Sequence, residues 1–267
     1  ANEAAIKLAR LATGKSTIIS FTQSFHGRTY GAMSATGQDS IHSGLPMLTG
    51  FKYANFNVID SVAALIDDDT AAIMLELVQG EGGVFPANQE FISALVKLAQ
   101  RHNILIIVDE VQTGMGRTGT KFAYMNYQFE PDIVTSAKAL ANGLPVGAML
   151  AKNHLANALS YGTHGSTFGG NPLVMSAAQA TLSVLDDVLP TLQPKIDIFW
   201  EKLAAIAALS VVSEVRGLGM MAGIALETPV KDVVSDLLDE HIIVLSAGQN
   251  TLRLLPPLTI PSDKLIN

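Results

Sequence analysis

Two charged side chains stand at the ends of apolar segments in the middle of the chain. Residues 133–137 are followed by Lys138, and residues 104–108 are followed by Asp109 and Glu110. A lysine at the end of a buried strand is costly unless its amine is used. Because ligands of an open parallel sheet bind beyond the carboxyl ends of its strands, the two segments predict an amine and a carboxylate over one crevice.

An amine and a carboxylate in one crevice are the two groups that pyridoxal phosphate requires. This cofactor forms a Schiff base with a lysine and needs an anion beside its ring nitrogen. Lys138 and Asp109 therefore predict a pyridoxal-phosphate site, in which the freed Lys138 amine moves a proton between substrate and cofactor carbons. The opposite charge of Asp109 raises the pKa of the ring nitrogen.

The composition allows a large core and excludes several classes of function. The 267 residues are 48% hydrophobic and 15% charged, enough for one large domain or a domain and a half. The net charge of −7 argues against a nucleic-acid partner. The lack of cysteine and the scattered histidines argue against a metal site. Since no apolar run reaches the ~18 residues of a membrane span, we expect a cytoplasmic protein.

Apolar segments of strand length alternate with helical patterns in the first 188 residues. This alternation predicts right-handed βαβ units, a parallel sheet and an α/β fold. Gly14 is expected to end the first helix, and Asn57 and Asn88 are expected to cap the next two. The expected strands are 16–21, 70–77, 103–109, 132–138 and 145–152, and the expected helices are those ending at 12 and 66, 88–102 and 172–187.

The pattern changes from about residue 189 and predicts a smaller α+β domain. Arg253 alternates with leucines there, so it projects from one face of a strand, where a lone arginine is usually a surface charge. The expected helices are 196–209 and 230–240, and the expected strands are 211–215, 220–226, 242–245 and the segment from 251.

Three loops carry further candidates for a site. Phe25 and Arg28 follow the first strand, and Glu81 lies in a glycine-rich acidic loop. An ordinary turn with a core aromatic and a solvated charge are the alternative interpretations. The loop at residues 161–172 is rich in glycine and hydroxyl groups and precedes a helix, which suits an anion such as phosphate; an ordinary connection is its alternative.

Residues 106–110 and the triplet Gly14-Lys15-Ser16 also resemble parts of a P-loop ATPase. The phosphate loop requires G-x-x-x-x-G-K-[ST] between a strand and a helix. Here Ala9 occupies the first glycine position, and the triplet follows a helix and precedes a strand. The ATPase is kept as an alternative of a different class. A third alternative, an interaction module without chemistry, leaves the charged strand ends unexplained.

Several motifs, taken in order, resemble those of the class III (subgroup II) pyridoxal-phosphate aminotransferases. The spacing of 29 residues from Asp109 to Lys138 is the most specific feature, and the resemblance covers essentially the whole chain. The motifs are Phe25-His-Gly-Arg-Thr, Glu76-Leu-Val-Gln-Gly-Glu-Gly-Gly83, Val108-Asp-Glu-Val-Gln112-Thr-Gly-Met-Gly-Arg-Thr-Gly119, Thr135-Ser-Ala-Lys138, His164-Gly-Ser-Thr-Phe-Gly-Gly-Asn-Pro172, Arg216-Gly-Leu-Gly-Met and Arg253-Leu-Leu-Pro-Pro-Leu.

The resemblance implies a fold-type I architecture and a homodimer with active sites at the subunit interface. A large cofactor-binding domain (1–188) with a mainly parallel seven-stranded sheet is expected before a small C-terminal domain (189–267). The sequence is expected to be incomplete at both ends, because the family's phosphate-binding turn would precede Ala1. Leu77 and His241 stand where proline and glycine are common in the family.

The resemblance also implies roles for individual residues around the cofactor. Lys138 corresponds to the Schiff-base lysine and Asp109 to the partner of the ring nitrogen. Gln112 lies toward the phenolic oxygen, Phe25 stacks on the ring, and Thr167 binds the phosphate from the other subunit.

Four more residues correspond to substrate contacts in the family. Ser166 lies next to the substrate, and Arg28 binds the carboxylate of an acylated substrate. Arg253 holds the α-carboxylate of the oxo acid, and Glu81 is its switchable partner.

The resemblance is closest to members that act on N-acetylornithine. It implies transfer of the distal amino group to 2-oxoglutarate, which gives N-acetylglutamate semialdehyde and glutamate in arginine biosynthesis. Arg28 favours an acidic, acylated substrate. The alternatives within the family are ω-aminotransferases of 4-aminobutyrate, ornithine or succinyldiaminopimelate.

Overall fold

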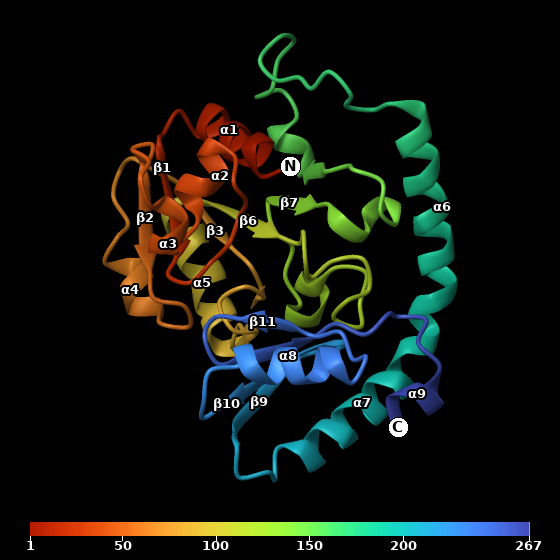
Figure 1. The fold of residues 1–267 in the computed structure, drawn as a ribbon. Coiled ribbons are helices and arrows are strands. Elements are labelled where there is room, and N and C mark those ends of the chain that lie inside the picture. Colours follow the sequence, from red (N-terminus) through yellow and green to blue (C-terminus); the bar gives the residue numbers. More distant parts are fainter. Residues whose placement is uncertain (267) are drawn as a thin grey trace.

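A mainly parallel sheet, here called the main sheet, organises the first part of the chain (Figure 1). The structure is a computed structural model that describes residues 1–266. Neighbouring strands from β2 to β7 run parallel, and β8 pairs antiparallel with β7. The α/β fold expected from the sequence is therefore confirmed. In spatial order the strands are β2 (Phe51–Ala54), β1 (Thr17–Phe21), β3 (Thr70–Leu75), β6 (Leu105–Asp109), β7 (Ile133–Ser136) and β8 (Ala148–Ala151).

Helices cover both faces of the main sheet. In β1, Ile18 packs with residues of α1, whereas Ile19 packs with residues of α5. Strand side chains alternate between faces, so both faces of β1 are buried, and each fully buried isoleucine contributes roughly 1.5–3 kcal/mol. The helices of this part are α1 (Asn2–Thr13), α2 (Tyr30–Ala35), α3 (Asp39–His42), α4 (Ile59–Ala63) and α5 (Gln89–His102), with 3₁₀ turns η1 (Ala123–Tyr127), η2 (Lys138–Ala141) and η3 (Asn153–Leu155).

The first helix ends where the sequence predicts. Gly14 has φ 67°, and its N–H donates to the Arg10 carbonyl at 2.9 Å. Glycine adopts this left-handed conformation without the penalty of a Cβ atom. Lys15 and Ser16 therefore lie between a helix and β1, the reverse of the order that a phosphate loop requires.

The prediction that Asn57 caps a helix is wrong. α4 begins after Val58, and Asn57 has φ 63°. Its side chain accepts a hydrogen bond from Asn88 N–H at 2.8 Å and donates one to Pro86 O at 3.1 Å. The amide thus fixes the chain before α5 instead. Asn88 does precede α5, although its side chain makes no capping bond within the described residues.

The main sheet shows one strand fewer in residues 1–266 than the seven that the resemblance implies. β2 and β8 are its outermost strands. After β8 the chain forms η3 and then a loop rich in glycine, serine and threonine, up to Asn171. Such residues favour turns, and no described segment pairs with the outer edge of β8.

A second, antiparallel sheet, here called the small sheet, follows in the sequence. It has its own apolar core, which includes Phe199, Leu203 and Ile224. β11 begins three residues later than expected, and Ile243 in the expected segment is exposed. The strands, in spatial order, are β11 (Leu245–Ala247), β12 (Thr251–Leu254), β10 (Met221–Leu226) and β9 (Val212–Leu218), and the helices are α7 (Leu192–Ile206), α8 (Lys231–Asp239) and α9 (Ser262–Ile266).

The long helix α6 (Pro172–Val188) runs along one side of the molecule and leads through η4 (Leu189–Thr191) to α7 (Figure 1). It begins as predicted, with Pro172 in its first turn and the Asn171 side chain accepting from Val174 N–H at 3.1 Å. None of the helices described over residues 1–266 is both long and apolar enough to cross a membrane.

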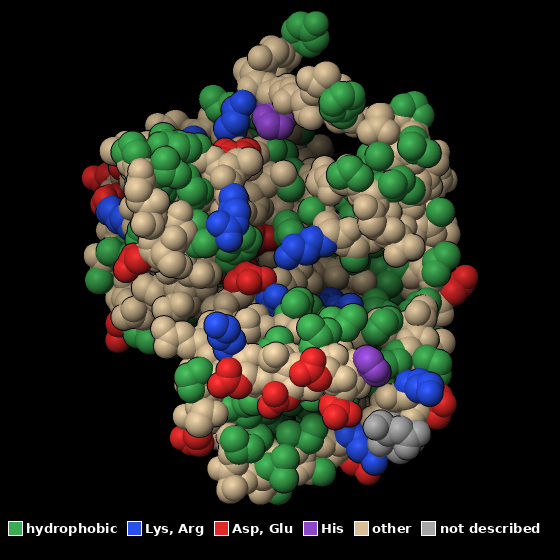
Figure 2. Space-filling view, viewed as in Figure 1, with side chains coloured by type: hydrophobic (Ala, Val, Ile, Leu, Met, Phe, Trp, Pro, Cys, Tyr) green, Lys and Arg blue, Asp and Glu red, His purple; other side chains and the backbone are tan. Residues whose placement is uncertain are grey.

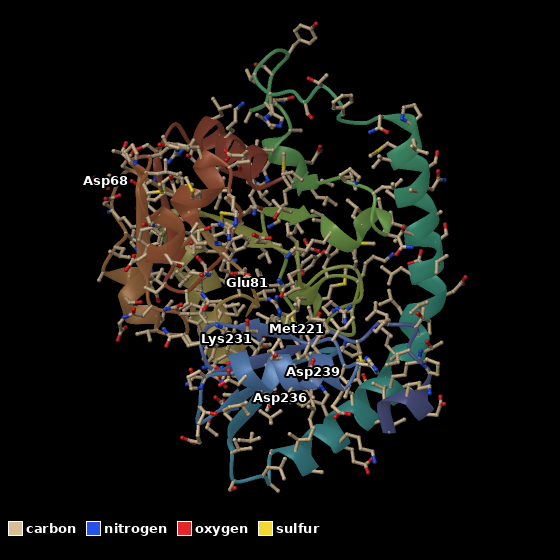
Figure 3. All side chains as sticks on the ribbon, viewed as in Figure 1. Asp68, Glu81, Met221, Lys231, Asp236 and Asp239 are labelled. Atoms are coloured by element: carbon tan, nitrogen blue, oxygen red, sulfur yellow. The ribbon has the colours of Figure 1, made fainter. Side chains whose placement is uncertain are left out.

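A short hairpin lies between the two sheets. It consists of β4 (Val78–Gln79) and β5 (Phe85–Pro86), and residues 78–86 are called the Glu81 hairpin below. Figure 3 shows Glu81 at the boundary between the two parts of the chain, above Met221 of β10.

Candidate active site

Three strands of the main sheet deliver polar side chains to one edge. β6 ends at Asp109, β3 is followed by Glu76, and β7 leads into Lys138. Asp109 lies opposite Thr135 in the parallel pairing of β6 with β7. Because the carboxyl ends of parallel strands share an edge, the fold brings the predicted amine and carboxylate to one end of the sheet, as the sequence indicates.

Asp109 is buried, with 3% of its surface exposed, and both of its oxygens are bonded. Oδ2 accepts hydrogen bonds from His26 Nδ1 at 2.8 Å and from Asn2 Nδ2 at 2.7 Å. Oδ1 accepts one from Val111 N–H at 3.0 Å. These donors come from separate parts of the chain, so they fix the direction in which the carboxylate points.

Sequence reasoning missed His26 as a partner of Asp109. Burial alone lowers the pKa of the His26 imidazole, but the hydrogen bond and charge of Asp109, with the charge of Glu76, outweigh it and raise the pKa. Asn2 ties the pair to α1, because it also donates to the His26 carbonyl at 2.6 Å. The only signal in the sequence was that His26 stands beside Phe25 in a recognised motif.

Glu76 adds a second buried carboxyl to this group. One of its oxygens accepts from Phe25 N–H at 3.0 Å. Burial raises the pKa of Glu76 to about 7, and the charge of Asp109 adds to this, while the charges of His26 and Lys138 oppose it. Two carboxyl groups and one imidazole therefore share a site in which another positive charge would be stabilised.

We expect Glu76→Gln to change how stability depends on pH. The folded-state pKa of about 7 lies above the ordinary value of 4.5. The stability that Glu76 contributes is therefore complete below about pH 4.5 and is lost as the pH rises through about 7. A difference of this size corresponds to roughly 3 kcal/mol, so the melting temperature of Glu76→Gln relative to the unsubstituted protein should rise by about 5 °C from pH 4 to pH 8.

Melting curves of the cofactor-free protein at several pH values measure this difference. The exposed Asp68 provides a matched control, because Asp68→Asn removes a carboxyl group at the surface (Figure 3). If the curves for Glu76→Gln and the unsubstituted protein stay parallel across this pH range, Glu76 does not titrate as the structure implies.

Lys138 has an unusual backbone conformation. Its φ is 46°, in the left-handed region, which costs a non-glycine residue roughly 1–2 kcal/mol. Lys138 and Gln112 line a cavity of about 750 Å³ that extends along α6 to Pro257. Asp109 does not line this cavity, so the cavity adjoins the group of buried acids rather than containing it.

The residues present fit pyridoxal phosphate. The acidic surplus of Asp109 and Glu76 complements a cationic ring nitrogen, and the exposed Lys138 provides the amine. Ser136 Oγ, two residues before Lys138, is buried without a hydrogen-bond partner among the described residues. Asp109, Lys138 and Phe25 would hold the cofactor, which when bound supplies a ring that accepts electrons from the reacting carbon.

The structure brings Glu81 and Arg253 together. Arg253 is 7% exposed, and its Nη1 donates to Glu81 Oε1 at 2.7 Å and to Gly80 O at 2.9 Å. Gln112 lies beside this pair: its Oε1 accepts from Arg253 Nη1 at 3.4 Å, and its Nε2 donates to Glu81 Oε1 at 3.5 Å. The Nε atom of Arg253 is buried and unpartnered within residues 1–266.

The remaining predicted residues occupy two places. Arg28 is exposed, with its guanidinium carbon 5.8 Å from the centre of the half-buried Phe25 ring. In Figure 2, acidic and basic side chains gather round a hollow at the centre of the drawn face. Ser166 and Thr167 are exposed in the loop before α6, which stands apart from β6 and β7 in Figure 1. A single chain therefore does not bring these two to Lys138.

Comparison with known proteins identifies the class. Residues 1–267 match the family model Aminotransferase class-III, so the chain belongs to the class III aminotransferases, which depend on pyridoxal phosphate. The acetylornithine aminotransferases of Streptococcus mutans serotype c and Bacillus subtilis are 52% and 50% identical to it. The matches cover 99% of this chain and 71% and 70% of those proteins.

Solved structures agree with this assignment. The ornithine aminotransferase of Toxoplasma gondii superposes with a TM-score of 0.92 at 29% identity, over 99% of this chain and 69% of that one. The N-acetylornithine aminotransferase of Stenotrophomonas maltophilia gives a TM-score of 0.82 at 34% identity, over 99% of this chain and 68% of that one.

Proposed function

We propose that this aminotransferase moves the distal amino group of N-acetylornithine to 2-oxoglutarate, giving N-acetylglutamate semialdehyde and glutamate. The ion pair of Glu81 with Arg253 carries the proposal, because it lets one site serve two substrates. The acetylornithine aminotransferases that are about half identical to this chain support it.

Lys138 and Asp109 act on the reacting atoms in this proposal. The Lys138 amine would take the proton from the substrate carbon that bears the amino group and pass it to the cofactor carbon. Asp109, held by His26 and Asn2, would supply the negative charge that the ring nitrogen of a bound cofactor needs. Phe25 lies beside Glu76 at the same edge, where it can cover the ring. Because both half-reactions use one site, ping-pong kinetics are expected.

Arg253 has a different task in each half-reaction. In 2-oxoglutarate the reacting carbonyl carbon itself carries a carboxylate, which a guanidinium binds strongly. In N-acetylornithine the reacting carbon carries no carboxylate, and a buried unpaired Arg253 would be costly. Glu81 pairs with Arg253 in the structure and lies on a glycine-rich loop that allows it to move aside.

We expect Glu81→Ala to favour the glutamate half-reaction. With Arg253 free at all times, the glutamate rate should rise relative to the N-acetylornithine rate by about tenfold, the value of one charge-assisted hydrogen bond. Arg253→Ala should instead impair the glutamate half-reaction most. Single-turnover absorbance of the cofactor measures both rates, and an unchanged ratio in Glu81→Ala would mean that Glu81 is only a solvated charge.

The substrate assignment rests on a comparison of amines. We expect kcat/KM for N-acetylornithine to exceed that for ornithine and 4-aminobutyrate by at least about tenfold, because the exposed Arg28 can bind the carboxylate of an acylated substrate. A preference for ornithine or 4-aminobutyrate would move the assignment to another ω-aminotransferase. The likeness to an ornithine aminotransferase structure makes ornithine the first competitor to measure.

We further propose that the chain acts as a homodimer in the cytoplasm. The loop before α6 and α6 itself expose large apolar side chains, a surface that suits a second copy. Ser166 and Thr167 lie in this loop, so the partner's site is the one they would complete. Residues 1–188 and 189–267 are proposed as the cofactor-binding and small domains, which the separate apolar cores support. The exposed apolar residues are Tyr161, Phe168, Leu173, Met175 and Val184.

A further inference from the structure

Arg216 of β9 holds the Glu81 hairpin from the small sheet. Its Nε donates to the Gly83 carbonyl at 2.9 Å, and its guanidinium carbon lies 3.8 Å from the centre of the Phe85 ring. Glu81 is two residues before Gly83. Arg216 thus contacts the residues that follow Glu81 in the same loop, the loop that presents Glu81 to Arg253.

Arg216 and Arg253 belong to one row of the small sheet. Both residues lie opposite Gly223 of the central strand β10, one from β9 and the other from β12. Residues directly opposite one another in a sheet point to the same face. The two guanidinium groups therefore flank Gly223 on one face, and the Glu81 hairpin lies over that face.

Gly223 leaves the space that the hairpin occupies. A Cβ atom at Gly223 would come within 2.8 Å of Val84 Cβ and within 2.9 Å of Thr251 Cγ2. Val84 is fully buried with Met221 and Ala247, although its φ of 59° is strained for a β-branched residue. The packing of Val84 against the small sheet therefore sustains a strained loop conformation.

The guanidinium group of Arg216 also donates a hydrogen bond to β12, the strand that carries Arg253. Its Nη2 donates to Thr251 Oγ1 at 3.0 Å, and its Nη1 donates to Glu214 at 2.6 Å. Thr251 is two residues before Arg253 on β12 and so shares its face. One side chain thus joins the loop of Glu81 to the strand of Arg253.

We infer that Arg216 is a positioning residue that sets how readily Glu81 leaves Arg253, and thereby the choice between the two substrates. This inference rests on the proposed exchange of partners at Arg253. Arg216 touches no reacting atom. It acts by restraining the hairpin, since its bond to Gly83 and its stacking on Phe85 must loosen when the loop moves.

Two substitutions separate this role from a general loss of folding. Arg216→Lys keeps the charge but loses the planar fork and its stacking. Thr251→Val keeps the shape of Thr251 and removes one bond to Arg216. Arg101→Lys, in the exposed part of α5, is the matched control.

Hydrogen exchange of the cofactor-free protein gives the first readout. Peptides covering residues 78–86 should exchange roughly fivefold faster in Arg216→Lys, and less so in Thr251→Val, as expected for the loss of restraining hydrogen bonds. Peptides of α5 should exchange at the same rate in all proteins. Unchanged exchange over residues 78–86 overturns the inference.

Half-reaction rates of the cofactor-loaded protein give the second readout. The ratio of the glutamate rate to the N-acetylornithine rate should rise roughly fivefold in Arg216→Lys, while the same substitution added to Glu81→Ala should leave the ratio of that variant unchanged. If Glu81→Ala shifts the ratio and Arg216→Lys does not, the inference fails and the proposed function stands. If neither substitution shifts the ratio, the proposed exchange of partners at Arg253 is wrong, and the inference about Arg216 is wrong with it.

Discussion

Lys138→Ala should lower the rate of transamination by about 10⁴-fold or more, the largest effect expected of any single substitution in this chain. In the proposed mechanism the amine of Lys138 is both the point of covalent attachment and the group that moves the proton, and the methyl group of alanine can do neither. Lys138 is the lysine that follows β7 at the edge where Asp109 ends β6.

Turnover and the absorption spectrum of the cofactor-loaded protein measure this effect. The spectrum of Lys138→Ala should lack the band of the lysine-bound cofactor. Lys97→Ala, on the exposed side of α5, is the control and should behave like the unsubstituted protein. A variant at Lys138 that retains even one-tenth of the turnover would exclude this residue as the attachment site.

Asp109→Asn should slow proton abstraction by on the order of 10²-fold or more, because electrostatic stabilisation is usually the largest catalytic contribution. Asparagine keeps the size of the side chain but loses the charge. An amide hydrogen at the Oδ2 position would also face His26 Nδ1, which is 2.8 Å away and needs an acceptor when it is protonated. The pKa of His26 should fall in this variant, since burial lowers it and the hydrogen bond and charge of Asp109 raise it.

Stopped-flow rates of the first half-reaction decide whether Asp109 has this role. Asp68→Asn serves again as the surface control, because it removes an equal charge far from the carboxyl ends of the strands. A loss of less than threefold in Asp109→Asn would contradict the role of Asp109. We expect Asp109→Asn to bind the cofactor but to carry out the first half-reaction slowly.

The strand ends could be predicted because their signal is local. Apolar runs of strand length that end in Asp109 and Lys138 are visible in a few residues, and the topology of parallel strands then brings them to one edge. Arg253 was likewise predicted to project from one face of a strand, and it does so opposite Gly223.

The partners of these residues could not be predicted because they are distant in the sequence. Asn2 bonds Asp109 across 107 residues and His26 does so across 83, and no local pattern encodes such a meeting. The prediction that Asn57 caps a helix was wrong for a related reason. The amide of Asn57 bonds Asn88 across 31 residues, and this contact outweighed its preference for a helix cap.

The contacts of Ser166 and Thr167 stay predictions. Both residues are exposed in the loop before α6, and Thr167 was predicted to bind the phosphate from the other subunit. The pair of Glu81 and Arg253 could be predicted only in part. Residue by residue, each was an ordinary charge, and only the family resemblance predicted that they would meet.

Reductive labelling tests the central claim most directly. Borohydride treatment of the cofactor-loaded protein fixes the pyridoxyl group on the lysine that carries it, and peptide mapping then identifies that lysine. We predict label on the peptide that contains Lys138, with none after the same treatment of Lys138→Ala. Label on another lysine, or equal labelling of Lys138→Ala, would contradict the assignment of this edge of the main sheet as the active site.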